Sequence, residues 1–294
     1  MSTHAGIVAL AGRPNTGKST LLNALAGVKV AAVSDRPQTT RRAIRGIWSS
    51  GDRQIVFVDL PGVQRPRDLL TSRMARRVSR ELEGADAVLM LLAADERIGA
   101  GDRFIARTLQ DAGRPVVVAL NKVDRLKAPR VAAALHAADQ LGIGEAIFPI
   151  SARTGAGVAA LLEDLGSRMP EGPFMFGRNA HSDQPLALTL AELIREAVVR
   201  RTFQELPHAT EVIVEEIERT SSGLTTVRAL IWVDSDSQKG IVIGAQGRKI
   251  KSIGSAARRD LERELATPVH LDLTVRTRRG WREDDALLDR LGIT

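Results

Sequence analysis

One short stretch combines glycines, a lysine and a hydroxyl at the spacing of a phosphate-binding loop: residues 12–20, GRPNTGKST. The glycines allow the backbone to curl so that its N–H groups point at phosphate oxygens. Lys18 is expected to reach the terminal phosphates of a nucleotide, and the Ser19 hydroxyl to bind Mg²⁺. The residues that we expect to cradle the phosphates are Gly12, Arg13, Pro14, Asn15, Thr16, Gly17, Lys18, Ser19 and Thr20.

A second candidate group lies at the end of the apolar run 54–58, where the sequence is Asp-Leu-Pro-Gly. A carboxylate at the end of a strand can hold the water shell of a magnesium ion, and the glycine N–H can meet a terminal phosphate. This motif is weak alone, but it gains weight at this distance after a phosphate loop. It adds Asp59, Leu60, Pro61 and Gly62 to the expected nucleotide contacts.

The polar, proline-containing residues 30–41 are typical of a mobile loop. A loop of this kind can be ordered by a terminal phosphate and Mg²⁺ and released after hydrolysis. We expect Thr40 to be the further metal ligand, with Thr39 as the alternative. Both threonines also suit the start of a strand.

A third group of residues can recognise a base. Asn121, Lys122 and Asp124 follow the apolar run 115–120. The Asp124 carboxylate can accept from both N1–H and the 2-amino group of guanine, a donor pair that adenine lacks, while the lysine stem covers the ring. Asn121 is expected to tie this segment to the phosphate loop. Guanine O6 can accept from the backbone of the Ser-Ala pair after the next apolar run, Ser151 and Ala152.

Strands that alternate with helices must position these groups. The pattern predicts an α/β fold, a doubly wound, mostly parallel sheet with all the loops at one edge. Residues 5–168 resemble a translation-factor-type small GTPase domain, which implies a Ras-like fold and the conversion of GTP and water to GDP and phosphate. The catalytic residues expected from this resemblance are Lys18, Thr40, Gly62 and Asn15.

One departure from that pattern bears on the rate of hydrolysis. Many GTPases place a glutamine directly after Asp-x-x-Gly to orient the attacking water, but here the position is Val63, so we expect slow intrinsic turnover. Gln64 is the neighbour and would project differently. Asn15 resembles the asparagine that helps to bind K⁺ in related GTPases, and such an ion could supply the missing positive charge.

The second half of the chain begins with a Pro- and Gly-rich linker at residues 169–185. A helical apolar pattern follows, then two alternating runs, 210–217 and 224–233, joined by the turn composition Ser-Ser-Gly. The acidic residues of the first run are expected on a solvated outer face, and Trp281 in a core. His181, His208 and His270 show no metal-ligand spacing. The acidic residues in question are Glu211, Glu215 and Glu218.

The segment 239–254 is a helix pattern interrupted by Gly-x-x-Gly and resumed as a basic helix. Glycines allow a sugar–phosphate backbone to approach closely, and the basic side chains can meet its charge. A pair of glycines between helices can also be only a turn. The element order of residues 186–294, with a C-terminal helix, is similar to a type II KH domain, which implies single-stranded RNA binding. The expected contacts are Ile243, Gly244, Ala245, Gln246, Gly247, Arg248, Lys249 and Lys251.

Composition narrows the class of protein. The 294 residues contain no cysteine, which excludes disulfides and thiolate metal sites, and only 3% aromatics, which argues against binding through stacked rings. The net charge of +7 favours an anionic partner. The N-terminus leaves no room for a secretory signal and no apolar run is long enough to span a membrane, so a cytoplasmic protein is expected.

The whole chain resembles the Era family of bacterial GTPases in residues 12–20, 37–41, 121–124, 244–247 and 268–271. The resemblance implies binding near the 3′ end of 16S rRNA, action on the 30S ribosomal subunit and peripheral association with the inner face of the cell membrane. It identifies no protein partner. Leu60 and Arg153 depart from the family's usual residues. The alternatives are a membrane-associated cell-cycle or signalling GTPase whose basic segment meets anionic lipid, and a GTPase-assisted RNA-modifying enzyme.

Overall fold

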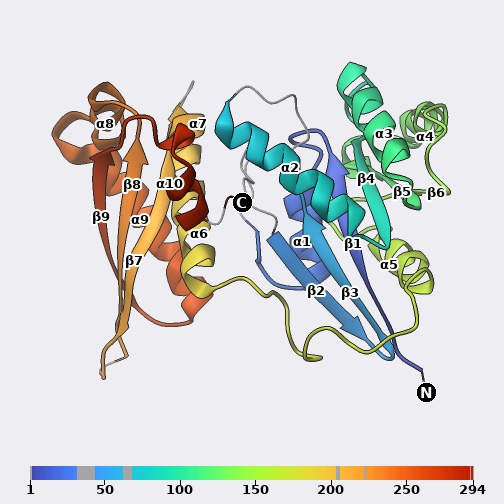
Figure 1. The fold of residues 1–294 in the computed structure, drawn as a ribbon, viewed down its shortest axis with the longest axis horizontal. Helices are drawn as coiled ribbons and strands as arrows, with labels where there is room; N and C mark the ends of the chain where they lie inside the picture. The colour runs from blue at the N-terminus through green and yellow to red at the C-terminus, as the bar shows by residue number, and fades with distance from the viewer. Residues whose placement is uncertain are drawn as a thin grey trace. The chain divides into compact units, whose positions relative to one another are not determined.

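The computed structural model describes residues 2–31, 44–61, 68–202, 206–221, 223–291 and 293. The predictions for Thr39, Thr40, Gly62, Val63 and Gln64 lie outside these residues. The chain forms two compact units (Figure 1). The described segments 2–31, 44–61 and 71–183 belong to the first, and residues 68–70 and 184–294 to the second. Among the described residues, no helix has the length and apolar character needed to cross a membrane.

The first unit is built on a six-stranded sheet in the order β2-β3-β1-β4-β5-β6. All neighbouring strands are parallel except β2, which is antiparallel to β3. The predicted mostly parallel, doubly wound sheet is therefore confirmed. The strands are β1 (His4–Gly12), β2 (Ile44–Ser50), β3 (Arg53–Asp59), β4 (Ala87–Ala93), β5 (Val116–Asn121) and β6 (Ala146–Pro149).

Helices cover both faces of this sheet. One core contains side chains of α1 and α5, and the other contains side chains of α2, α3 and α4. The sequence of β4 is apolar throughout because its alternate residues, such as Leu89 and Met90, enter the two different cores. The helical elements are α1 (Lys18–Ala26), α2 (Leu69–Glu83), α3 (Ala100–Ala112), the 3₁₀ turn η1 (Val123–Arg125), α4 (Ala128–Asp139) and α5 (Val158–Ser167).

The segment expected to be a linker lies against the first unit up to about residue 183. The amide of the buried Gln54 pairs with the backbone of Phe176 in both directions, at 2.9 Å each. Further along, the Ile47 N–H of the edge strand β2 donates to His181 O at 2.9 Å. The Pro- and Gly-rich composition therefore describes a strap with irregular backbone, fixed by hydrogen bonds to the sheet that it follows.

The second unit has a three-stranded sheet, β7-β8-β9, in which β7 and β8 form an antiparallel hairpin and β8 and β9 are parallel. Parallel strands need a long crossover, and α8, η2 and α9 supply it. This is the predicted order of a KH domain. The elements are α6 (Leu186–Arg201), α7 (Leu206–Ala209), β7 (Glu211–Arg219), β8 (Thr225–Val233), α8 (Asp236–Ile243), η2 (Ala245–Gly247), α9 (Arg248–Leu265), β9 (Val269–Thr277), η3 (Trp281–Glu283) and α10 (Asp285–Arg290).

The prediction for Glu211 is wrong. Glu215 and Glu218 are exposed as expected, but Glu211 at the start of β7 is fully buried. A β-bulge between Val214 and Glu216 also shifts the register of the strand, so the simple alternation does not extend along its length. Burial lowers the pKa of Arg195 on α6, but the charges of the surrounding glutamates, Glu211 among them, raise it further, so the pKa lies above its usual range. The buried acid therefore belongs to an ionic cluster within the fold.

Trp281 is buried as predicted, and its ring N–H donates to Ala209 O at 3.2 Å.

Candidate functional site

The loop between β1 and α1 has a backbone that only certain residues can adopt. Gly12 and Gly17 have φ of 151° and 99°, and Asn15 has φ of 66°. A Cβ on Gly12 would lie 2.6 Å from Leu91 O, and one on Gly17 would lie 2.3 Å from Asn121 Nδ2. The loop is therefore closed against its neighbours, with space for glycine alone at two positions. Its end at the first turn of α1 gives the N–H groups and positive dipole end that favour an anion.

The side chain of Lys18 folds back into this loop. Its Nζ donates to Gly12 O and Arg13 O, at 3.1 Å each. Burial lowers the pKa of Lys18, and the nearby Asp59 carboxylate offsets part of that shift. The ammonium thus lies at the centre of the loop, where it can meet phosphate oxygens.

Ser19 and Asp59 lie together at the edge of the phosphate loop. Ser19 Oγ donates to Asp59 Oδ2 at 2.6 Å, and Asp59 is fully buried at the end of β3. A hydroxyl and a carboxylate are oxygen donors of the hard type that Mg²⁺ prefers. The two predicted metal ligands that the structure describes are therefore adjacent.

Asn121 joins three loops. Its Nδ2 donates to Thr16 O at 2.8 Å, as predicted for the tie to the phosphate loop, and its Oδ1 accepts from Ala152 N–H at 2.9 Å. Ala152 N–H, expected to face guanine O6, is thus engaged by Asn121, and Ser151 N–H donates to Ala156 O at 2.9 Å. Contact of this loop with O6 would require one of these bonds to be shared or exchanged.

Asp124 lies in η1, the 3₁₀ turn that begins directly after Lys122, whose φ is 67°. Its Oδ1 accepts from Ser151 Oγ at 2.7 Å and its Oδ2 from Arg153 at 2.6 Å. The Ser151 hydrogen bond, with those of Arg153, lowers the pKa of Asp124 and outweighs the effect of burial. The group is therefore ionised at neutral pH, as recognition of a donor pair requires.

Sequence reasoning missed an ionic chain along this rim. Arg13 of the phosphate loop binds Asp102 at 2.9 Å and Glu96 at 2.5 Å. Glu96 lies 3.7 Å from Lys122 Nζ, and Asp95 lies 3.5 Å from the same atom. This series of ion pairs links the phosphate loop to the base-recognition segment. Its acids follow β4 or begin α3 without any motif of their own, so no sequence signal identifies them.

In the second unit, the Gly-x-x-Gly segment forms a tight turn between α8 and α9. Gly244 and Gly247 both have φ of 72°, and Gln246 has φ of 53°. A Cβ on Gly244 would lie 2.7 Å from Lys249 Cβ. The predicted interruption of the helix is confirmed, and at Gly244 the turn requires glycine both for its backbone and for the close approach of Lys249.

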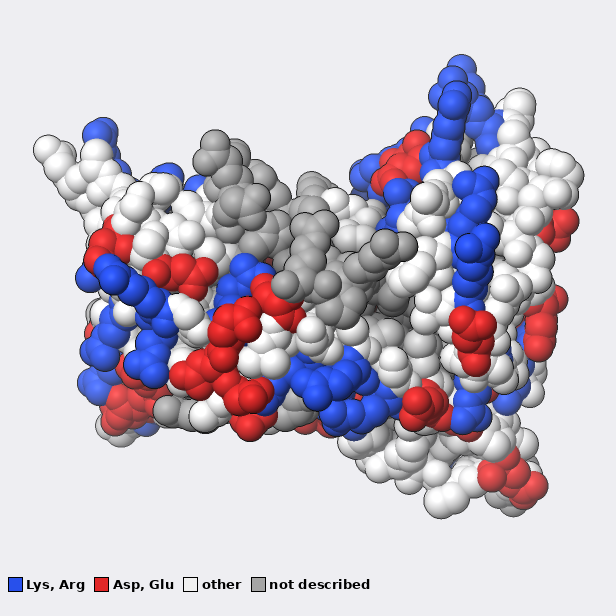
Figure 2. Space-filling model, turned by 45° about the horizontal axis from the view of Figure 1, so that its top comes forward, with Lys and Arg blue, Asp and Glu red and all other residues white. Residues whose placement is uncertain are grey.

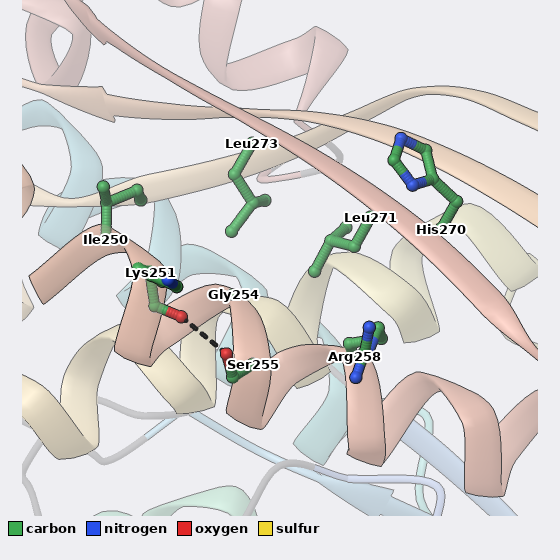
Figure 3. Close-up of a pocket in the computed structure, with 8 residues that line it drawn as sticks. All are labelled: Ile250, Lys251, Gly254, Ser255, Arg258, His270, Leu271 and Leu273. Carbon is green, nitrogen blue, oxygen red and sulfur yellow. Dashed lines mark hydrogen bonds between the residues drawn. The ribbon is translucent and has the colours of Figure 1, made fainter. Parts of the chain in front are cut away.

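Beside this turn, α9 and β9 enclose a groove of about 360 Å³ (Figure 3). Leu271 and Leu273 project from β9 toward α9, which gives the groove an apolar floor. Of the predicted RNA contacts, Lys251 lines it. The lining residues are Ile250, Lys251, Gly254, Ser255, Arg258, His270, Leu271 and Leu273.

The other seven lining residues were absent from the predicted site. Those on α9 recur at helical spacing, from Ile250 to Gly254 to Arg258, and Leu271 and Leu273 alternate along β9. These periods are the signal that could have identified them. On the face in Figure 2, basic and acidic side chains are interspersed, so the net positive charge does not form one continuous surface there.

Comparison with known proteins supports the same two-part organisation. The family model described as a 50S ribosome-binding GTPase matches residues 7–122, and the KH domain model matches residues 205–282. The GTPase Era of Mycobacterium bovis (strain BCG / Pasteur 1173P2) is 44% identical, with 98% of each chain covered. That of Lactobacillus helveticus is 41% identical, with 98% of this chain and 95% of the relative covered. This chain belongs to the Era family of GTPases.

Two solved structures of the Era family resemble the whole chain. The crystal structure of Era in complex with MgGDPNP and nucleotides 1506–1542 of 16S ribosomal RNA has a TM-score of 0.93, 33% identity and 99% coverage of both chains. A variant of Aquifex aeolicus Era bound to GDP and AlF₄⁻ has a TM-score of 0.94 and 33% identity, with 99% of this chain and 100% of that chain covered.

The structure places the two residues that we expected to depart from the family pattern, Leu60 and Arg153, in different surroundings. Leu60 is fully buried and packs in the core beneath α2 and α3. Arg153 instead binds the carboxylate of Asp124. The first departure is therefore confined to packing, while the second lies in the candidate base site.

Proposed function

We propose that this protein is a GTP-hydrolysing switch that binds 16S ribosomal RNA near its 3′ end and assists the biogenesis of the 30S ribosomal subunit. The observation that carries the proposal is the Asn121 side chain, which holds the phosphate loop and the Ser-Ala segment together within one site. The neighbouring Asp124 makes that site selective for guanine. The family model, the relatives and the two full-length structures support both halves.

The phosphate loop fits a nucleoside di- or triphosphate. Lys18 already lies within hydrogen-bonding distance of the loop carbonyls and would turn to the phosphate oxygens, while the first turn of α1 offers backbone donors. Ser19 and Asp59 fit Mg²⁺ in type, and they would hold it directly or through water. The ion, when bound, neutralises charge on the phosphates. Thr40 remains the proposed further ligand.

Hydrolysis rests on the same loop. We assign Lys18 the role of stabilising the charge that develops on the transferred phosphoryl group. Thr40, Gly62 and Asn15 stay proposed catalytic residues, and Val63 implies slow intrinsic turnover. Asn15 with K⁺ is a separate prediction: hydrolysis rates measured in K⁺ and Na⁺ at equal ionic strength should differ, and equal rates would contradict it.

The groove between α9 and β9 fits single-stranded RNA. An apolar floor can accept bases without stacked rings, and Lys251 and Arg258 lie at its rim to meet phosphates. The glycine turn before α9 lets the backbone of the nucleic acid approach. The Era relative bound to 16S ribosomal RNA nucleotides supports this partner. We place the protein in the cytoplasm, with peripheral membrane association as a further proposal and no protein partner assigned.

Two single variants test the proposal and the proposed division into residues 5–168, 169–185 and 186–294. Lys18→Ala should abolish measurable GTP and GDP binding and leave binding of a 16S 3′-end oligonucleotide intact. Gly244→Asp should do the reverse, because it strains a φ of 72° and places a negative charge on the RNA path. Titration calorimetry and gel shifts report the two affinities. Loss of both activities in either variant, or no binding of the oligonucleotide by the unmodified protein with GTP present, would contradict it.

A further inference from the structure

The carboxylate of Asp124 is engaged on both oxygens by one loop, residues 151–157. Ser151 donates to Oδ1 at 2.7 Å, and Arg153 donates to Oδ2 at 2.6 Å. The Ser151 hydroxyl also accepts from Thr154 N–H at 3.2 Å, so it is held within its own loop. Arg153 differs, because its side chain is 73% exposed and, among the residues that the structure describes, Asp124 is the partner at its far end.

The backbone that carries Arg153 is well fixed. Gly155 N–H donates to Ser151 O, and Ser151 N–H to Ala156 O, both at 2.9 Å. Gly157 has φ of 74°, and a Cβ there would lie 2.3 Å from Pro149 O. A closed loop of this kind holds the base of the Arg153 side chain in place, so the guanidinium reaches Asp124 from a constant position.

An ion pair with an exposed cation contributes little to folding, about 0–1 kcal/mol, so folding alone does not account for this contact. The guanidinium presents N–H donors in a planar fork that matches a carboxylate. The edge of guanine that a carboxylate recognises, N1–H and the 2-amino group on a shared carbon, is itself a cyclic guanidine. Arg153 and guanine therefore offer the same kind of donor, and in the structure one guanidinium nitrogen holds Asp124 Oδ2, an oxygen that the guanine edge would also use.

We propose that Arg153 is a partial internal mimic of the guanine edge, which competes with the base for Asp124 Oδ2 and must release that oxygen before the base can be held by both oxygens. The inference rests on the proposed function, since it assumes that Asp124 recognises guanine. If the ion pair breaks when the base binds, its free energy is lost on binding, and the affinity for guanine nucleotides falls by that amount. We expect the upper half of the range for such a pair, which lowers guanine-nucleotide affinity by about two- to fivefold.

The direct test is Arg153→Ala, with GDP affinity measured by titration calorimetry. GDP should bind about two- to fivefold more tightly than to the unmodified protein at low ionic strength. The difference should shrink toward none near 1 M salt, where charges are screened within about 3 Å. Arg107→Ala, which removes the same charge from an exposed position on α3, should leave GDP affinity unchanged. Unchanged or weaker GDP binding by Arg153→Ala, or a salt-independent difference, would overturn the proposal.

A second background separates this inference from the proposed function. In Asp124→Asn the side-chain amide can donate to the C2 carbonyl of xanthine, so xanthosine diphosphate serves as the probe. Adding Arg153→Ala to Asp124→Asn should leave the affinity for xanthosine diphosphate unchanged, because the carboxylate that holds Arg153 is gone. Equal tightening in both backgrounds would overturn the mimic. Absence of any preference for GDP over ADP in the unmodified protein would instead refute the proposed function.

Discussion

The two candidate sites are built in different ways. The nucleotide site is made largely of backbone: three residues of its loop have positive φ, and the buried Asn121 ties that loop to its neighbours. The groove of the second unit is made of the faces of a helix and a strand, with partly exposed side chains at every position of its lining except the glycine. A backbone-built site tolerates few substitutions, whereas a groove built from faces should lose affinity in small steps.

The largest expected effect is at Gly17. Gly17→Ala adds a Cβ that would lie 2.3 Å from Asn121 Nδ2, at a backbone φ of 99°. It should weaken GDP binding by about 100-fold or more, because the loop moves by a large part of an ångström. We expect a loss of about 2 kcal/mol in unfolding free energy. Titration calorimetry and denaturant unfolding measure the two quantities.

Gly113→Ala is the matched control for Gly17→Ala. Gly113 ends α3 with φ of 65°, and a Cβ there meets nothing within 4 Å. This variant should cost about 1 kcal/mol of stability for the backbone conformation alone and leave GDP affinity unchanged. If the two variants weaken GDP binding equally, the contact with Asn121 is irrelevant and the nucleotide site is not built as described.

The next effect is the pH dependence of nucleotide binding. Burial lowers the pKa of Lys18 in the nucleotide-free protein, and bound phosphate oxygens should raise it. Between these two pKa values binding takes up a proton, so GDP affinity falls as pH rises, by up to about tenfold per pH unit. Calorimetry in two buffers of different ionisation enthalpy, repeated over a series of pH values, measures the proton uptake. The control variant Gly244→Asp, in the other unit, should show the same proton uptake on GDP binding. Zero uptake at every pH measured would contradict the role of Lys18.

The sequence identifies these two sites to different degrees. The nucleotide residues form short contiguous motifs, because a closed loop constrains neighbouring positions. The sequence could therefore predict that residues 12–20 form one loop and that Asn121 is tied to it. The sequence could not predict that Arg13 pairs with Glu96 and Asp102, because an acidic residue after a strand or in the first turn of a helix has no motif that marks its partner. The groove residues are spread over α9 and β9, and His270 was noted within the segment 268–271 that carries the family resemblance, with no binding role assigned to it. The prediction that Glu211 is exposed was wrong because its burial by α6 depends on tertiary packing.

A substitution in the groove should separate binding from stability. Gly254 lies within α9, and a Cβ there would lie 3.6 Å from Leu273 Cδ1, an ordinary contact. Gly254→Leu fills the groove while it replaces a poor helix former by a good one. RNA affinity in gel shifts should fall about tenfold, which corresponds to ~1.4 kcal/mol, and unfolding free energy should stay equal or rise by up to ~1 kcal/mol.

Gly240→Ala is the control for the helix effect. Gly240 is exposed in α8, and a Cβ there meets nothing within 4 Å. Gly240→Ala should raise the unfolding free energy by about 1 kcal/mol and leave RNA affinity unchanged. If Gly254→Leu instead leaves RNA binding intact, the groove between α9 and β9 is not the path of the nucleic acid.

The smallest expected effect is at the rim, where one charge is removed without filling the groove. Arg258 is half exposed and lies 3.8 Å from Glu262, too far for a strong pair, so its guanidinium is available to a phosphate. Arg258→Ala should weaken RNA binding by about threefold and reduce the slope of log affinity against log salt by about 0.7, the value for one phosphate of a single strand. Arg263→Ala is the matched control, because Arg263 lies on the same helix, outside the groove, and binds Asp260 at 2.6 Å. An equal loss in both variants would mean that α9 acts through its overall charge, and the groove would then lack the local phosphate contact that distinguishes it from a general basic surface.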